Sequence, residues 1–237
     1  MTDHAHSQVV GKAFAEGCGA EVVHARHYDP NDERIPVMFG ILRGTGDLVK
    51  DRWARNLPFL YIDHGYFKPG HYEGYYRVCK SDLQAQYVHE TSPERFEALK
   101  IKLEPRKIGR AAAIANPSAY VLSFFEAPPP DVWVGDAVQS YTSGWNLFTV
   151  NSHNSEERSI FKKVCSLATL QSNLSIEAIR RGIAVKFVEP RRSIRPITHP
   201  AKSDWTDRRD LFHSLANSQF TLDEMRRGVA WEKLNAG

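Results

Sequence analysis

The chain has little cysteine and no long apolar run, and each absence excludes a class of protein. Its three cysteines, Cys18, Cys79 and Cys165, lie far apart, match no metal-binding spacing and are odd in number. We therefore expect reduced, buried thiols instead of a disulfide framework or a zinc site. No apolar run reaches the length of a membrane span, and the opening MTDHAHSQVV lacks the basic and apolar regions of a signal peptide. These absences predict a cytoplasmic protein without a membrane partner.

The composition also has no strong charge bias, no repeats and no low-complexity segment. The chain of 237 residues is 42% hydrophobic and 25% charged, which is typical of a globular protein with a proper core. A net charge of +3 is too small to indicate nucleic-acid binding by itself. Basic residues do cluster at residues 100–110 and 191–195. Each cluster is compatible either with ordinary surface charge or with a surface that contacts phosphates.

The most informative segment is LATLQSNLSIEAIRRGIAVKFV at residues 167–188. It predicts a strand at 167–170, a polar turn at 171–173, a helix at 174–181, a stop at Gly182 and a second strand at 183–188. This order is a βαβ unit, and the first turn of its helix offers unpaired backbone N–H groups to a phosphate. Two interpretations remain open: a nucleotide site, or a helix with an ordinary N-terminal capping sequence that only packs on a sheet.

If the segment is a nucleotide site, its side chains can be assigned either to the phosphates or to the ribose. Ser172, Asn173 and Ser175 are small polar residues that can cap the helix or contact a phosphate. Glu177 follows near the same turn, where a carboxylate can accept hydrogen bonds from two ribose hydroxyls. We therefore expect these four residues to bind a nucleoside diphosphate.

The N-terminal half predicts a second βαβ unit. Its elements are a strand at 37–42, a glycine-bearing turn at 43–46, a helix at 47–56 and a strand at 59–63. The first 30 residues predict loose structure with one strand at 20–24. Residues 67–87 predict a long aromatic loop that contains a short strand at 75–78. The turns that follow the two strands should lie at neighbouring carboxyl ends of parallel strands, where ligands bind in open α/β sheets.

Three consecutive prolines, Pro128 to Pro130, give the clearest boundary signal because they cannot continue a helix or occupy a central strand. We expect one α/β lobe at residues 1–127 and a second α/β lobe at residues 128–237, which ends in two helices at 203–234. The predicted fold class is α/β, with two Rossmann-like lobes and a C-terminal helical segment.

Several motifs resemble those of known glycosyltransferases. Residues 177–185, EAIRRGIAV, resemble the donor half of GT-B glycosyltransferases, in which a Ser/Thr-rich turn leads into E-A-x-x-x-G-(I/V)-P-(V/I); here Ala184 replaces the usual proline. Two more patterns resemble small GT-B-like proteins of bacteriophages. They are YIDHGYF at 61–67 with YYRV at 75–78, and D-x3-R-x2-LF-x2-LA-x2-QFTL-x-E-x3-G-x2-W at 204–231. Together these resemblances cover most of residues 35–234. They imply a GT-B-like fold with an acceptor-side lobe at residues 1–127 and a donor-binding lobe at residues 128–237.

The resemblance implies transfer of a sugar from a nucleotide-sugar donor to a hydroxyl group, in phages often on a hydroxylated base of their own DNA. It also implies a metal-independent reaction without a cofactor, and the chain has no Asp-x-Asp motif, the usual metal-diphosphate signal of the GT-A class. Where relatives commonly carry a basic Arg-x-Lys after the first donor strand, this chain has Asn151-Ser152-His153-Asn154. Ser152 and His153 are the candidates there for contact with the diphosphate.

Candidate catalytic and acceptor residues follow from the predicted sheet ends. Asp63 is the first candidate for the base that deprotonates the acceptor and His64 the second, although an aspartate after a strand often only caps the next turn. The candidates for acceptor contact are basic, hydroxyl or aromatic residues near these ends and in the first basic cluster: Arg43, Thr45, Tyr66, Tyr76, Arg77, Arg106 and Lys107. Their arginines and lysine would contact DNA phosphates, and their tyrosines would hold an extruded base.

Three functions remain open at this point. The first is a glycosyltransferase that modifies DNA, and the second is the same fold acting on a polysaccharide or a small acceptor. The third is a nucleotide- or DNA-binding protein that has lost transfer, which the missing basic pair at residues 151–154 makes credible. Release of nucleoside diphosphate in the presence of hydroxymethylated DNA separates the first function from the other two.

Overall fold

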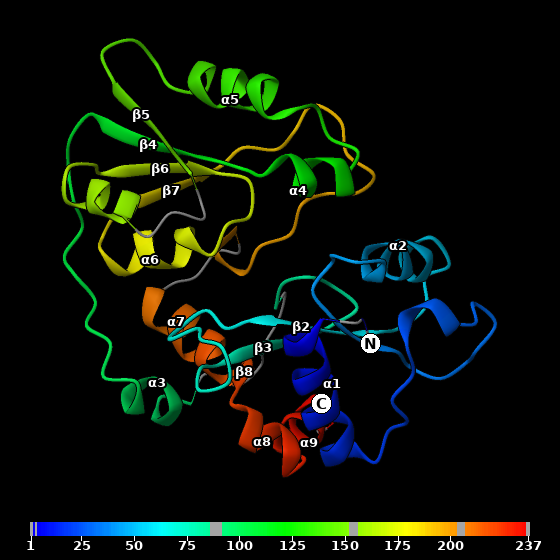
Figure 1. Cartoon of the computed structure of the whole chain (residues 1–237). Coiled ribbons are helices and arrows are strands. Elements are labelled where there is room, and N and C mark those ends of the chain that lie inside the picture. Colours follow the sequence, from blue (N-terminus) through cyan, green and yellow to red (C-terminus); the bar gives the residue numbers. More distant parts are fainter. Residues whose placement is uncertain (1, 3, 86–91, 152–155, 203–206, 236–237) are drawn as a thin grey trace. The chain divides into compact units, whose positions relative to one another are not determined.

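The computed structural model describes residues 2, 4–85, 92–151, 156–202 and 207–235, and the chain forms two compact units (Figure 1). The first unit comprises Met1–Leu99 and Arg209–Gly237, and the second unit comprises Lys100–Arg208. This division differs from the expected boundary between residues 127 and 128. The prolines lie inside the second unit, where Pro130 is the first residue of helix α5 (Pro130–Gln139). Proline is tolerated there because an N–H at that position would have no partner within the helix.

The first unit contains a mixed sheet with the strand order β1-β2-β3-β8. Its strands are β1 (Val37–Phe39), β2 (Leu60–His64), β3 (Tyr76–Lys80) and β8 (Gln219–Phe220). Strands β1 and β2 are parallel and are connected through α2 (Thr45–Ala54), which confirms the expected strand–helix–strand order. Strand β3 pairs antiparallel with both β2 and β8, so the sheet is mixed and is completed by a strand from the far end of the sequence.

A helix that the sequence did not predict covers this sheet. Helix α1 (Ala5–Cys18) replaces the loose structure expected for the first 30 residues, and residues 20–24 form no strand. It packs against β1 and against two C-terminal helices, α8 (Leu222–Arg226) and α9 (Val229–Asn235). Their buried apolar side chains form one core with those of the sheet, including Val10, Phe14, Leu60, Ile62, Tyr76, Phe220 and Met225.

The contact between α1 and α8 depends on Gly17. A Cβ atom at this position would overlap the carbonyl oxygen of Met225 and lie 2.7 Å from the backbone nitrogen of Gly228. We expect Gly17→Ala to lower the free energy of unfolding by about 2 kcal/mol, because the two helices must separate. Gly135→Ala in α5 is the matched control. Its new Cβ meets nothing within 4 Å, so it should raise stability by about 0.5–1 kcal/mol. Urea unfolding measures the free energy of unfolding of both variants. Equal changes in Gly17→Ala and Gly135→Ala would contradict the prediction.

The second unit contains a parallel sheet with the strand order β5-β4-β6-β7 (Figure 1). The strands are β4 (Ala111–Asn116), β5 (Asn146–Asn151), β6 (Ser166–Thr169) and β7 (Ala184–Phe187). The predicted βαβ unit at 167–188 is confirmed as β6, α6 (Leu174–Arg180) and β7. Residues Ala112 to Ala115 of the central strand β4 are at most 1% exposed, which shows that this sheet is covered on both faces.

The remaining elements are short. The first unit also contains α3 (Glu94–Ala98), the 3-10 helix η1 (Ala25–His27) and most of α7 (Arg208–Asn217). The second unit also contains α4 (Ala119–Phe124) and the 3-10 helices η2 (Glu156–Lys162) and η3 (Pro200–Lys202). In the part of the chain that the structure describes, no helix combines the length and apolar composition needed to cross a membrane. The protein is thus an α/β protein with one mixed and one parallel sheet.

Candidate functional site

The carboxyl end of the parallel sheet in the second unit is the first candidate site. The central strand β4 pairs with β5 on one side and with β6 on the other. The chain runs from β4 to β5 and then crosses to β6, so the strand order changes direction between β4 and β6. Open α/β sheets bind ligands outside the carboxyl ends of the strands at such a switch point. Here those ends are Asn116 and Thr169.

Polar groups border this switch point. The side-chain Oδ1 of Asn116 is buried and has no hydrogen-bond partner among the described residues. Ser118 caps α4, since its Oγ accepts a hydrogen bond from the backbone nitrogen of Val121 at 3.2 Å. Thr169 Oγ1 accepts one from the backbone nitrogen of Ser172 at 3.3 Å. An unsatisfied buried acceptor costs free energy. A ligand that donates a hydrogen bond to Asn116 Oδ1 would remove this cost.

The structure ties Ser175 into the fold instead of exposing it to a phosphate. Its fully buried hydroxyl donates to the carbonyl oxygen of Ser172 at 2.8 Å and lies 2.9 Å from Nε2 of His199. Because His199 Nδ1 accepts a hydrogen bond from the backbone nitrogen of Ala201 at 3.1 Å, its Nε2 carries the proton and donates to Ser175. Ser172 Oγ accepts from the backbone nitrogen of Leu174 at 3.2 Å, so it shapes the turn.

Glu177 is engaged as well. Its carboxylate accepts hydrogen bonds from Arg180 at 2.7 and 2.9 Å and from Arg181 at 2.6 Å. Burial opposes ionisation of this carboxyl, but the bonds from the two arginines outweigh burial and hold its pKa below the usual value. A ribose would have to compete with two guanidinium groups for the same oxygens. Asn173 occupies the N-cap position of α6, whereas Ser152 and His153 lie outside the described residues.

In the first unit, Asp63 near the end of β2 is half-buried and forms an ion pair with the buried Arg77. Its Oδ2 accepts hydrogen bonds from the Tyr61 hydroxyl and from Arg77 Nη2, both at 2.9 Å, and its Oδ1 accepts one from the backbone nitrogen of His64 at 2.7 Å. Arg77 also donates to the carbonyl oxygens of His64 at 2.8 Å and Leu83 at 3.1 Å. The arginine is buried, so it links β2 and β3 and has no surface for an acceptor phosphate.

The two tyrosines expected to hold a base are buried too. Tyr66 donates to Gln84 Oε1 and accepts from the backbone nitrogen of Ala85, both at 2.9 Å, and Tyr76 belongs to the core of the first unit. Burial is the main cause that raises the pKa of both hydroxyls. The sequence could not distinguish these buried rings from exposed ones, because aromatic residues serve both purposes.

The other acceptor candidates differ in exposure. Arg43 is exposed in the turn before α2 with a positive φ of 60°, and Thr45 is buried, donating its hydroxyl to the carbonyl oxygen of Leu42 at 2.6 Å. Arg106 is exposed on the surface of the second unit. Lys107 is held to the fold, because its ammonium donates to the carbonyl oxygen of Phe161 at 2.7 Å.

Four histidines, which the sequence did not group, gather at the carboxyl end of β2. The ring centroid of His6 lies 4.4 Å from that of His71, 5.6 Å from His64 and 6.4 Å from His4. Burial, and then the neighbouring histidines, lower the pKa of His6 from 6.5 to about 4. These histidines come from three separate segments of the chain, so no local sequence motif predicts that they lie together. Among the described residues, no set of three or more histidine, cysteine, aspartate or glutamate side chains is arranged to hold a metal ion.

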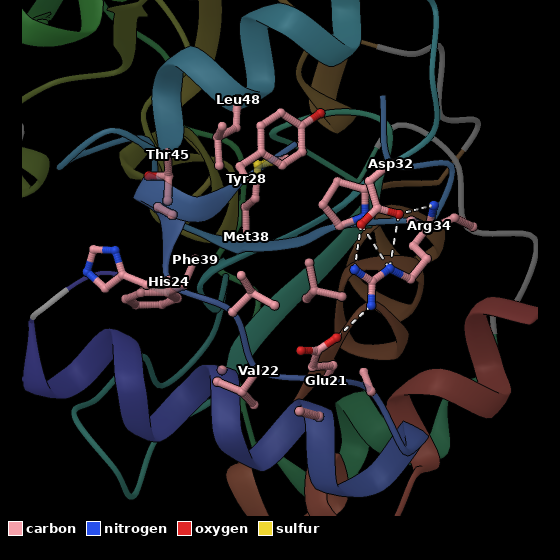
Figure 2. A pocket seen from close by; sticks show the side chains of 18 of the residues that line it. Glu21, Val22, His24, Tyr28, Asp32, Arg34, Met38, Phe39, Thr45 and Leu48 are labelled. Atoms are coloured by element: carbon pink, nitrogen blue, oxygen red, sulfur yellow. Dashed lines mark hydrogen bonds and ion pairs between the residues drawn. The ribbon is translucent and has the colours of Figure 1, made fainter. Parts of the chain in front are cut away.

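A pocket of about 470 Å³ lies in the first unit, between α1, β1, α2 and residues 19–36. This volume is within the usual range for small-molecule sites. Figure 2 shows apolar side chains, among them Met38, Phe39 and Leu48, on part of its wall. Arg34 bridges Asp32 and Glu21 at 2.6–3.0 Å along another part. The wall thus offers an apolar surface together with charged groups of both signs.

Comparison of the chain with protein-family models and with curated proteins finds no match.

Proposed function

We propose that the protein is a metal-independent glycosyltransferase of the GT-B type that works in the cytoplasm and binds a nucleotide-sugar donor in the second unit. The observation that carries the proposal is the strand order β5-β4-β6-β7, whose change of direction between β4 and β6 marks a ligand site in open parallel sheets. The buried, unsatisfied Oδ1 of Asn116 at that point adds support. The resemblance of residues 177–185 to the donor half of GT-B enzymes favours a nucleoside diphosphate as the ligand.

We assign the donor contacts to Asn116, Ser172, Asn173 and the backbone N–H groups of the turn that contains them. The engagement of Ser175 with His199, and of Glu177 with two arginines, removes both residues from the expected donor set. Short turns of this kind bind phosphates through backbone amides, so the assignment does not need the basic pair that residues 151–154 lack.

For the acceptor we propose a hydroxylated base in DNA. Supporting this choice are the resemblance to phage proteins and the exposed Arg106 and Arg110 in the first basic cluster. DNA affinity that weakens steeply with salt would favour this acceptor, since neutralised phosphates release counterions. Absence of DNA affinity even at low salt would favour a polysaccharide or small acceptor. Donor binding without transfer to any acceptor would favour the non-catalytic alternative.

Calorimetry with the four common nucleoside diphosphates tests the donor site. We expect Asn116→Leu to weaken the binding of the preferred diphosphate by up to about tenfold, since the lost hydrogen bond from a ligand hydroxyl or N–H group to the Asn116 amide oxygen costs about 0.5–1.5 kcal/mol. Asn146→Leu is the matched control, because Asn146 is an exposed residue at the amino end of the neighbouring strand β5. Equal diphosphate affinity of the two variants would show that the diphosphate does not bind at the switch point. If the unaltered protein bound none of the four diphosphates, the proposed donor would be refuted.

A further inference from the structure

Strand β1 has an open edge. In the described part of the chain it is the outermost strand of the mixed sheet and pairs with β2 alone. The carbonyl oxygen of Pro36 and the backbone nitrogen of Gly40 bond to β2, both at 2.9 Å. Because backbone groups alternate in direction along a strand, those of Val37 and Phe39 point away from β2. Among the described residues, no group forms a hydrogen bond with the N–H or C=O of these two residues.

The pocket of the first unit lies beside this open edge. All three residues of β1 line it, together with one face of α1 and one face of α2. These faces consist of Ser7, Gly11, Phe14 and Ala15 from α1 and of Thr45, Leu48 and Arg52 from α2. The spacing of three and four residues in each set places its members on the same side of the helix. Figure 2 shows the two helices on opposite sides of the pocket.

The pocket therefore has the position and the walls that a further strand beside β1 would need. Sheets in α/β proteins lie between layers of helices, and here α1 and α2 both border the space next to the edge strand. Residues 19–24 also line the pocket, and they form no strand. An extended segment in the pocket can bond the N–H and C=O groups of Val37 and Phe39, as in peptide recognition by strand addition.

The two helical walls specify which side chains such a segment should carry. Successive side chains of a strand point to opposite faces, so alternate residues of the segment meet α1 and α2. The α1 wall is mainly small or apolar, which suits branched aliphatic side chains. The α2 wall combines Leu48 with the polar residues Thr45 and Arg52, which suits short hydroxyl side chains.

The charged side chains of the lining indicate the sign of charge that the segment should carry. Acidic residues outnumber basic ones, with Glu21, Asp29 and Asp32 on one side of the balance and Arg34 and Arg52 on the other. The surplus is negative, so a basic residue next to the inserted stretch is favoured.

We propose that the first unit binds an extended segment of a partner protein, which adds to the mixed sheet beside β1. In this segment, branched aliphatic residues alternate with hydroxyl residues, and a basic residue flanks them. Binding requires neither a nucleotide-sugar nor the second unit, so the inference stands independently of the proposed function.

The probe is a fluorescently labelled peptide, acetyl-Lys-Val-Thr-Val-Thr-Val-Lys-amide, and fluorescence anisotropy measures its affinity for the full chain. Two further peptides carry N-methyl groups on all the valines or on all the threonines, whose N–H groups point to opposite edges of the strand. The set that faces β1 loses its hydrogen bonds, so at least one methylated peptide should bind about tenfold more weakly than the probe. Replacing both lysines by glutamate should also weaken binding. Equal affinity of the unmethylated and both methylated peptides overturns the proposal.

A pair of variants tests whether the peptide occupies this pocket. Ala15→Trp fills the pocket from α1 and leaves β1 unaltered. We expect it to lower the peptide affinity by about tenfold or more. Ala54→Trp is the matched control, because Ala54 is exposed at the end of α2 and does not line the pocket. It should leave the affinity unchanged, and equal affinities of the two variants overturn the assignment.

Amide hydrogen exchange followed by NMR gives a readout on the unaltered protein. The N–H groups of Val37 and Phe39 should exchange fast without the peptide and become protected when it is added, whereas that of Met38 faces β2 and should be protected throughout. Protection of both amides before the peptide is added would show that residues 20–24 themselves pair with β1, which overturns the proposal. Unchanged exchange after addition, or no binding of the probe, overturns it as well, and neither result affects the proposed glycosyltransferase function.

Discussion

Replacement of Asp63 by alanine should lower the free energy of unfolding of the first unit by about 3 kcal/mol, because removal of one partner leaves the other charge buried. Arg77 remains in the protein with its guanidinium buried, while the carbonyl oxygens of His64 and Leu83 still accept hydrogen bonds from it. Urea unfolding followed by circular dichroism measures the loss.

The double variant Asp63→Ala with Arg77→Met provides the control. Replacing a buried ion pair by apolar side chains of similar size is often neutral or even stabilising. We therefore expect the double variant to recover most of the stability that Asp63→Ala loses. If the single variant were as stable as the unaltered protein, Asp63 would not be the counterion that keeps Arg77 in the core, and its use as a base would again be open.

Acidification from pH 7 to pH 4 should also destabilise the first unit, through His6. Its pKa is about 4 in the folded protein, against 6.5 for an unperturbed histidine. Between these pH values the unfolded chain binds a proton that the folded chain does not, so a falling pH favours unfolding. The contribution of neutral His6 to the free energy of unfolding is therefore complete above pH 6.5 and is lost as the pH approaches 4. The difference in pKa corresponds to at most about 3 kcal/mol.

His6→Phe isolates this contribution, because phenylalanine keeps an aromatic ring among the same neighbours and does not titrate. Those neighbours are His4, His64, His71, Tyr72, Tyr76 and Phe39. The stability of this variant should change less between pH 6.5 and 4 than that of the unaltered protein. His27→Phe, an exposed position on η1, should leave the pH dependence as it is. An unchanged pH dependence in His6→Phe would show that His6 does not control the acid sensitivity.

The two βαβ units could be predicted because their signals are local. In each, an apolar run ends at small or polar turn residues and a helical pattern follows, so neighbouring residues alone determine the elements. Helix α1 lacks such signals. Its N-cap His4 makes no side-chain capping bond, and its first turn has no acidic residue. The helix is stabilised mainly by packing against α8 and α9, which are more than 200 residues away in the sequence.

The turn at residues 171–173 was predictable, and it does follow β6. Its place at a switch point, and the presence of Asn116 at the end of the neighbouring strand β4, were not predictable, because they depend on the strand order of the folded sheet. The partners of Ser175 and Glu177, in contrast, depend on where His199 and the two arginines lie after folding. A proline triplet was similarly ambiguous, because the same stiff segment can join two domains or begin a helix.

The discontinuous first unit has a consequence for biosynthesis. The second unit is a single stretch of chain, so it can fold as soon as residue 208 has left the ribosome. The first 99 residues must wait, because β8, α8 and α9 are translated after the second unit and supply one edge of their sheet and the partners of α1. Until then β3 lacks its partner β8, and α1 lacks the two helices against which it packs. Synthesis of residues Arg209–Gly237 is thus required before the first unit can complete its sheet and its helical layer.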